Sequence, residues 1–250
     1  MASNCPTGRR HWPAAWRGCD GCSGGTHIMR LLALDTATEG CSAACLAGES
    51  LVERYQIEPQ GHSRLLLTMV ESVLAETASQ RADLDAVAFD AGPGSFTGIR
   101  IGAGVAQGIS LGLELPLVGV SSLMALAEGV VDTVDTVAAV CAAIDARMGQ
   151  VYWARLVRDP NEAALWRWRE LPRVSAPEAV PALAVGEIGV GSGWDRYAEV
   201  LTGGVAVQWL PERFPRARQV AVIARRLLDS GATGAWQAAM PVYVRDQVTG

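Results

Sequence analysis

A glycine-rich nonapeptide, GPGSFTGIR at Gly92–Arg100, is the segment of this chain best suited to chemistry. It follows the apolar run Leu84–Phe89 and precedes a stretch of small and apolar residues at Ile101–Leu113. In α/β proteins such a loop either aims backbone N–H groups at an anionic ligand or lets a helix pack closely on a sheet. The segment therefore predicts a ligand loop or a tight corner, and both interpretations stay open.

The spacing of the loop excludes two common nucleotide-binding motifs. Gly92, Gly94 and Gly98 miss the G-x-G-x-x-G pattern of dinucleotide-binding enzymes by one residue. No Lys-Ser or Lys-Thr pair follows, as a P-loop would require. Neither a Rossmann enzyme nor a P-loop ATPase is supported.

Two turns that begin with aspartate occupy similar settings in the two halves of the chain. Asp35 follows the predicted strand Leu31–Leu34, and Asp145 follows the predicted strand Thr136–Ile144. A second strand is expected after each turn, at Cys41–Leu46 and at Gln150–Val157. The repeated strand–turn–strand pattern indicates two lobes that are distant copies of each other.

Two helices are predicted to flank the glycine-rich loop. Over Ser63–Glu76, apolar residues recur at helical spacing: Leu65, Leu66, Met69, Val70, Val73 and Leu74. The second helix, Ile101–Leu113, carries Gly104, Gly108 and Gly112 along one face. Each glycine inside a helix costs about 1 kcal/mol relative to alanine. Such a row needs a closely packed neighbour, which is either another part of this chain or the helix of a partner.

The inventory of reactive side chains argues against a hydrolase and a metalloenzyme. His62 is the only histidine beyond residue 27, and Ser95 lacks the spacing of a nucleophile elbow. Cys19 and Cys22 form a lone C-x-x-C pair, whereas a zinc site normally shows a second pair. We expect no catalytic residue, no metal and no cofactor.

Composition and charge narrow the class further. Half of the 250 residues are apolar, which predicts a folded globular chain. The net charge of −5 argues against a protein that binds nucleic acid by itself. Residues 1–28 lack periodicity and an export signal, and we expect either translation from Met29 or a disordered extension. No uncharged apolar run reaches the ~18 residues of a membrane span, so a soluble cytoplasmic protein is predicted.

Beyond these motifs, the chain from Met29 onward resembles one family, TsaB, also called YeaZ. The resemblance rests on segments that occur in the family's order: Arg30–Leu46, Gly61–Glu76, Asp90–Gly112, Gly119–Ala127, Ala142–Ala154, Val190–Trp194 and Pro241–Val248. It implies an α/β, two-lobed, duplicated fold of the actin-like ATPase (ASKHA) superfamily. The lobes would span residues 29–129 and 130–250, with the last helix packing back on the first lobe.

The resemblance also implies a function. TsaB proteins are the non-catalytic partners of TsaD, which, with the ATPase TsaE, transfers a threonylcarbamoyl group to the adenosine next to the anticodon of tRNA. It implies a direct heterodimer with TsaD, contact with tRNA only through the complex, and a homodimer as an option for the isolated chain. The residues expected at the partner interface lie on the two predicted helices: His62, Leu66, Met69, Val73, Gly104, Gly108 and Gly112.

In active members of the superfamily, the two aspartate turns bracket the phosphates of ATP-Mg²⁺. The resemblance therefore implies a degenerate nucleotide site at Asp35, Thr36, Asp145, Gly191 and Gly193. Ala37 stands where phosphate-binding relatives tend to carry glycine, and the aspartates could equally just close turns.

Rival functions and one departure from the family pattern remain. The rivals are an autonomous ATP-using enzyme of the superfamily and a glycoprotease-like peptidase. The histidine pair that binds metal in TsaD is missing. This chain also has Asp90-Ala91 where the family frequently has Gly-Arg, so it must do without that arginine or use Arg100 instead.

Overall fold

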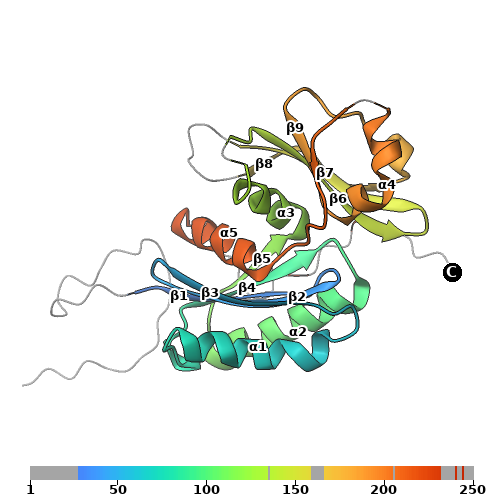
Figure 1. The fold of residues 1–250 in the computed structure, drawn as a ribbon. Coiled ribbons are helices and arrows are strands. Elements are labelled where there is room, and N and C mark those ends of the chain that lie inside the picture. The colour runs from blue at the N-terminus through green and yellow to red at the C-terminus, as the bar shows by residue number, and fades with distance from the viewer. Residues whose placement is uncertain are drawn as a thin grey trace, which may run out of the picture.

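The protein consists of two lobes, each built on a five-stranded sheet (Figure 1). The computed structural model describes residues 28–134, 136–158, 166–204 and 206–231, together with Met240 and Val244. The extension expected at residues 1–28 lies outside the described residues except for Ile28. None of the helices in these ranges is long and apolar enough to cross a membrane.

The first sheet has the strand order β3-β2-β1-β4-β5. Its strands are β1 (Arg30–Asp35), β2 (Gly40–Ala47), β3 (Ser50–Ile57), β4 (Ala86–Gly92) and β5 (Leu117–Ser121). The central strand β1 runs antiparallel to β2 and parallel to β4, with Leu34 opposite Ala43 and Phe89. Parallel pairing places the ends of β1 and β4 at one edge, so Asp35 and Asp90 come together there.

The second sheet repeats this plan with the order β10-β9-β6-β7-β8. Its strands are β6 (Ala139–Arg147), β7 (Gln150–Arg158), β8 (Trp166–Ser175), β9 (Glu187–Val190) and β10 (Trp209–Leu210). The central strand β6 is antiparallel to β7 and parallel to β9, as β1 is to β2 and β4. The prediction of a duplicated, two-lobed α/β fold is confirmed.

The helices form layers around the sheets (Figure 1). Helices α1 (His62–Glu76) and α2 (Phe96–Leu113) cover one face of the first sheet. Helices α3 (Ser122–Val131) and α5 (Ala217–Asp229) lie between the sheets, and α4 (Ser192–Thr202) packs on the second sheet. Short 3₁₀ turns occupy Arg81–Asp83 and Pro177–Ala179.

Hydrophobic burial explains this arrangement. The apolar stripe of α1, including Leu66 and Val73, packs against Leu34 and Phe89 of the first sheet. Helix α5 follows the second sheet in the chain, yet Val220 packs with β1 and β5 of the first. Burial of such side chains contributes about 1.5–3 kcal/mol each. Because α5 follows the second sheet in the chain but packs on the first, it links the two lobes.

The start of α2 differs from the sequence prediction. The helix begins at Phe96 rather than at Ile101, so half of the glycine-rich nonapeptide is its first turn. Ser95 is extended, and its hydroxyl accepts a hydrogen bond from the Gly98 N–H at 3.3 Å. This N-cap satisfies one of the free N–H groups of the first turn. It thereby stabilises the start of a helix that contains several glycines.

Candidate functional site

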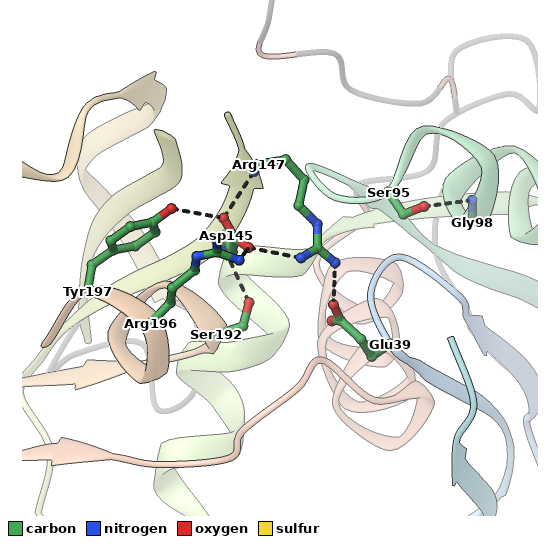
Figure 2. Close-up of polar contacts among 8 residues, drawn as sticks. All are labelled: Glu39, Ser95, Gly98, Asp145, Arg147, Ser192, Arg196 and Tyr197. Carbon is green, nitrogen blue, oxygen red and sulfur yellow. Dashed lines mark hydrogen bonds and ion pairs between the residues drawn. The ribbon is translucent and has the colours of Figure 1, made fainter. Parts of the chain in front are cut away.

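A cleft with a volume of about 870 Å³ lies between the lobes. On the first lobe it is lined by the turn after β1, including Glu39, and by the segment from Pro93 to Arg100. On the second lobe it is lined by the β6–β7 turn with Asp145 and Arg147. Figure 2 shows Glu39 and Ser95 on one side and the Asp145 cluster on the other.

Asp145 is held by two arginines. Arg147 and Arg196 each place a guanidinium nitrogen 3.1 Å from its Oδ2 (Figure 2). Its Oδ1 accepts the Arg147 N–H at 3.0 Å, which closes the turn. Arg147 also reaches across the cleft to Glu39 at 2.9 Å. The carboxylate is therefore neutralised by protein groups, and a metal–phosphate ligand would have to displace them.

Asp35 is in the opposite electrostatic state. It is fully buried, its Oδ1 accepts the Ala37 N–H at 2.8 Å, and the carboxyl of Asp90 lies beside it. Burial, reinforced by the charge of Asp90, raises the pKa of Asp35 well above its ordinary value. Burial thus disfavours the charged form of Asp35, and a carboxyl that resists ionisation is a poor ligand for ATP-Mg²⁺.

Asp90, at the departure from the family pattern, joins β4 to α3. Its Oδ1 accepts hydrogen bonds from the Gly92 N–H at 2.8 Å and from the hydroxyl of Ser122. Burial raises the pKa of Asp90 to about 7. Arg100 lies on α2 with its guanidinium 3.4 Å from the centre of the Phe96 ring. Asp35 and Asp90 are therefore two neighbouring carboxyls that are both buried.

The glycine-rich segment is a tight corner packed on the first aspartate turn. A Cβ atom at Gly94 would lie 2.2 Å from the Ala37 carbonyl oxygen, and one at Gly98 would lie 2.1 Å from that of Thr36. The Ser95 N–H donates to the Ala37 carbonyl at 2.7 Å, and the Thr36 hydroxyl donates to the Gly98 carbonyl at 2.7 Å. The N–H groups of Ser95 and Gly98 are thus already hydrogen-bonded within the protein, which favours the corner over the ligand loop.

Of the five residues expected at a degenerate nucleotide site, Asp145 alone lines the cleft. Asp35 and Thr36 are buried beneath it. A Cβ atom at Gly191 would lie 2.4 Å from the carbonyl oxygen of Ala143, and one at Gly193 would lie 2.9 Å from its carbonyl carbon. These glycines therefore let the start of α4 approach β6 closely. No group of three potential metal ligands occurs among the described residues.

The residues expected at a partner interface divide into two sets. His62, Leu66, Met69 and Val73 are buried in the first lobe, so their side chains support α1 from within. Burial lowers the pKa of His62.

The second set faces outward. Gly104, Gly108 and Gly112 are exposed. Apart from the adjacent residues and the helix's own nearby backbone, no described atom lies within 4 Å of a Cβ built on any of them. Internal packing therefore does not explain the glycine row.

The sequence did not point to several residues of the cleft and of the outer faces of α1 and α2. Glu39, Arg147 and Arg196 form the ion pairs of the cleft, and Leu67 and Leu111 are large exposed apolar residues on α1 and α2. Arg147 could have been suspected from its place two residues after Asp145. Arg196 could not, because only the folded chain brings α4 to the β6–β7 turn.

Two copies of one lobe around a cleft define a two-lobed protein of the ASKHA type. A protein described as tRNA threonylcarbamoyladenosine biosynthesis protein TsaB from Escherichia coli is 39% identical, covering 88% of this chain and 96% of its own length. The TsaB protein of Haemophilus influenzae is 33% identical, covering 88% and 95%. The chain therefore belongs to the TsaB family.

Structural and family comparisons agree with this result. A solved structure described as YeaZ from Pseudomonas aeruginosa matches with a TM-score of 0.78 and 34% identity, covering 86% of this chain and 99% of that one. A crystal structure described as that of a protein with similarity to the peptidase YeaZ from Pseudomonas aeruginosa matches with a TM-score of 0.80 and 35% identity, covering 87% of this chain and 100% of that one. Residues 56–163 match the family model of TsaD, described as tRNA N6-adenosine threonylcarbamoyltransferase.

Proposed function

We propose that this chain acts in tRNA threonylcarbamoyladenosine biosynthesis as the non-catalytic partner of TsaD. Membership of the TsaB family supports the place in this biosynthesis, because the E. coli and H. influenzae relatives carry that description. The observation that carries the partner role is the glycine row of α2, which is open to solvent.

The glycine row suits a second helix. Three glycines spaced four residues apart form a groove along one helix face, where a partner backbone can approach closely. Each glycine lowers the stability of the isolated helix by about 1 kcal/mol, and nothing in the described chain makes use of the space.

The surroundings of the row resemble an interface. Leu67 and Leu111 are more than half exposed, and the ion pairs Arg54–Glu76 and Arg81–Glu71 lie near the end of α1. An apolar centre with a polar rim is the usual composition of a protein–protein contact. We propose that the outer faces of α1 and α2 form the TsaD-binding surface. His62, Leu66, Met69 and Val73 would support this surface from beneath.

The states of the two aspartates support a non-catalytic role. Catalysis on ATP-Mg²⁺ needs ionised carboxylates that are free to hold the metal or a water. In this chain burial disfavours the charged form of Asp35, and Asp145 is engaged by Arg147 and Arg196. We infer that the chain stabilises and activates TsaD in the cytoplasm, with TsaE as a further member of the assembly and tRNA bound through the complex.

Reconstitution tests this function. Purified TsaD, TsaE, tRNA and the threonylcarbamoyl donor are incubated with and without this chain, and modified adenosine is measured by mass spectrometry. We expect modification only when the chain is present, and none from the chain with tRNA and donor alone. Full modification without the chain, or modification by the chain in the absence of TsaD, would overturn the proposal.

A further inference from the structure

The outer edge of the second sheet carries a row of arginines. β8 is the last strand in the order β10-β9-β6-β7-β8, so one of its edges pairs with β7 and the other pairs with no described strand. Three arginines of β8 are exposed, and we call them the arginine face: Arg167, Arg169 and Arg173. The segment 159–165, which lies outside the described residues, is not part of this surface.

The pairing with β7 places these arginines on one face of the sheet. Arg167 lies opposite Val157, and Arg173 lies opposite Trp153. Val157 and Trp153 are four residues apart on β7, and side chains alternate between the two faces of a strand. Arg167 and Arg173 therefore lie on the same face.

Arg169 belongs to this face as well. Its guanidinium lies 3.5 Å from Glu187 of β9, and Glu187 also pairs with Arg155, which stands between Trp153 and Val157 on β7. The side chain of Arg169 is 52% exposed, so this pair leaves much of the guanidinium open to solvent. Glu170, the one acid of β8, is turned to Arg155 at 3.6 Å.

Protection of the sheet edge does not account for three arginines. Edge strands commonly carry charges, prolines or bulges that prevent pairing with another chain. β8 already has Pro172, and its pairing with β7 shifts register twice. Charges of either sign would protect an edge, whereas the fully exposed charges of β8 are all positive in a chain whose net charge is −5.

The strand that carries the arginine face is fixed at both ends. At its start, Trp166 Nε1 donates to Glu128 of α3 at 3.0 Å. At its end, the Ser175 hydroxyl accepts a hydrogen bond from Trp153 Nε1, also at 3.0 Å. A surface that is rigid before binding loses less entropy when a ligand binds.

We propose that the arginine face of β8 binds the phosphate backbone of an RNA strand. Guanidinium groups bind phosphate oxygens through paired N–H donors. From Arg167 to Arg173 the row extends over up to about 20 Å, because each strand residue advances the chain by about 3.3 Å. A small anion would meet one arginine, whereas the repeated phosphates of a nucleic acid can meet all three. Such contacts position an RNA without reading its sequence.

The assignment of this RNA to tRNA rests on the proposed function, whereas phosphate binding by β8 does not. β8 lies in the second lobe, and α1 and α2 lie on the far side of the first lobe (Figure 1). A tRNA on β8 therefore leaves the proposed TsaD surface uncovered. Three phosphate contacts give weak binding to the isolated chain, and firm binding requires the additional contacts of a complex.

Salt-dependent binding of tRNA to the isolated full-length chain tests the proposal without TsaD. Fluorescence anisotropy of labelled tRNA is measured from ~20 to ~150 mM salt, because low salt strengthens every phosphate contact. Arg169→Gln/Arg173→Gln removes two of the three guanidinium groups. Glu187 keeps Arg155 at 3.7 Å and the Ala184 N–H at 2.7 Å, so we expect the strand to fold, as checked by circular dichroism. Binding should weaken about tenfold or more at the lowest salt, and the slope of log K against log salt should decrease by about 2.

Arg64→Gln/Arg81→Gln is the matched control, because it removes two exposed arginines, and the same charge, from the first lobe. It should keep nearly the affinity and slope of the wild type. Equal weakening by both double substitutions, an unchanged slope in the folded β8 variant, or no binding by the wild type at the lowest salt would overturn the proposal.

Two further titrations separate this proposal from its alternatives. Vesicles containing phosphatidylglycerol take the place of tRNA in the first. Binding of the vesicles but not of tRNA would assign the face to a membrane surface and would also overturn the proposal. In the second, TsaD is titrated with the wild type and the β8 variant, and we expect equal affinities. A failure of the partner role appears in the TsaD titration alone, and a failure of the arginine face appears with tRNA alone.

Discussion

At the scale of single residues, two aspartates in matching turns reach opposite states. Asp35 and Asp145 each accept the backbone N–H two residues on, which is the turn-closing role that their sequence setting allows. Their electrostatic surroundings could not be predicted, because Asp35 is buried beside Asp90 and Asp145 is paired with Arg196, and these partners are brought in by other strands and helices. Local sequence thus predicts the turn and tertiary structure decides the chemistry.

The buried carboxyl pair predicts an unusual pH dependence. A carboxyl whose pKa is raised on folding contributes stability at low pH that is lost as pH rises through the folded-state value. Burial raises the pKa of Asp90 to about 7 and also raises that of Asp35. We therefore expect the free energy of unfolding to fall between about pH 4 and pH 7, as measured by urea denaturation at a series of pH values.

Asp90→Asn should remove part of this loss. The asparagine oxygen can still accept from Gly92 and Ser122, and its NH₂ group can donate to Asp35. We expect a gain of roughly 1–3 kcal/mol at pH 7 and a flatter pH profile. Asp229→Asn, which alters an exposed ion pair with Arg225, is the control and should change stability by less than about 1 kcal/mol. If Asp90→Asn instead destabilises the protein at pH 7, the prediction that the buried Asp90 carboxylate lowers the free energy of unfolding is wrong.

At the scale of elements, the glycines of α2 fall into two classes. Periodicity predicted both flanking helices, but not that α2 starts inside the glycine-rich loop, because the Ser95 cap depends on the fold around it. Gly98 contacts the first aspartate turn, whereas Gly104 faces open space. The sequence analysis placed Gly98 in the loop and Gly104 in the predicted helix. Only the folded chain shows that Gly98 belongs to α2 and contacts the turn after β1.

Matched alanine substitutions should separate the two classes. Gly98→Ala places a methyl group against the Thr36 carbonyl, and we expect a loss of roughly 1–3 kcal/mol. Gly104→Ala meets no described atom, so the higher helix propensity of alanine should raise stability by about 1 kcal/mol. Denaturant unfolding of both proteins provides the measurement. Equal effects of the two substitutions would be inconsistent with this assignment.

At the scale of the whole molecule, the duplicated topology could be predicted, but the links between the lobes could not. The two aspartate turns indicated two copies, and both sheets have the same strand order. The return of α5 to the first sheet and the Glu39–Arg147 bridge join residues that are far apart in sequence. A cavity lined by Tyr55, Asp132 and Gln219 likewise depends on three segments that no local pattern connects.

The overall charge predicts how the chain meets tRNA. The net charge is −5 and the chain has no lysine, so arginine would have to make every basic contact with phosphate. We expect the isolated chain to bind tRNA at or beyond the weak end of the non-specific range, with Kd about 10⁻⁴ M at physiological salt. Filter binding at two salt concentrations measures this. Submicromolar binding would make the chain a primary tRNA receptor instead of a partner subunit.

The affinity of the chain for TsaD, measured by calorimetry, tests the central claim most directly. Gly108→Leu fills the glycine groove of α2 at a position where a Cβ atom meets no described atom outside its own stretch of helix. Glu199→Leu places an equally exposed leucine on α4 and serves as the control. We expect Gly108→Leu to fold normally and to weaken TsaD binding by about tenfold or more, with the control unchanged. Wild-type affinity in a folded Gly108→Leu protein would contradict the proposal that α1 and α2 form the partner surface.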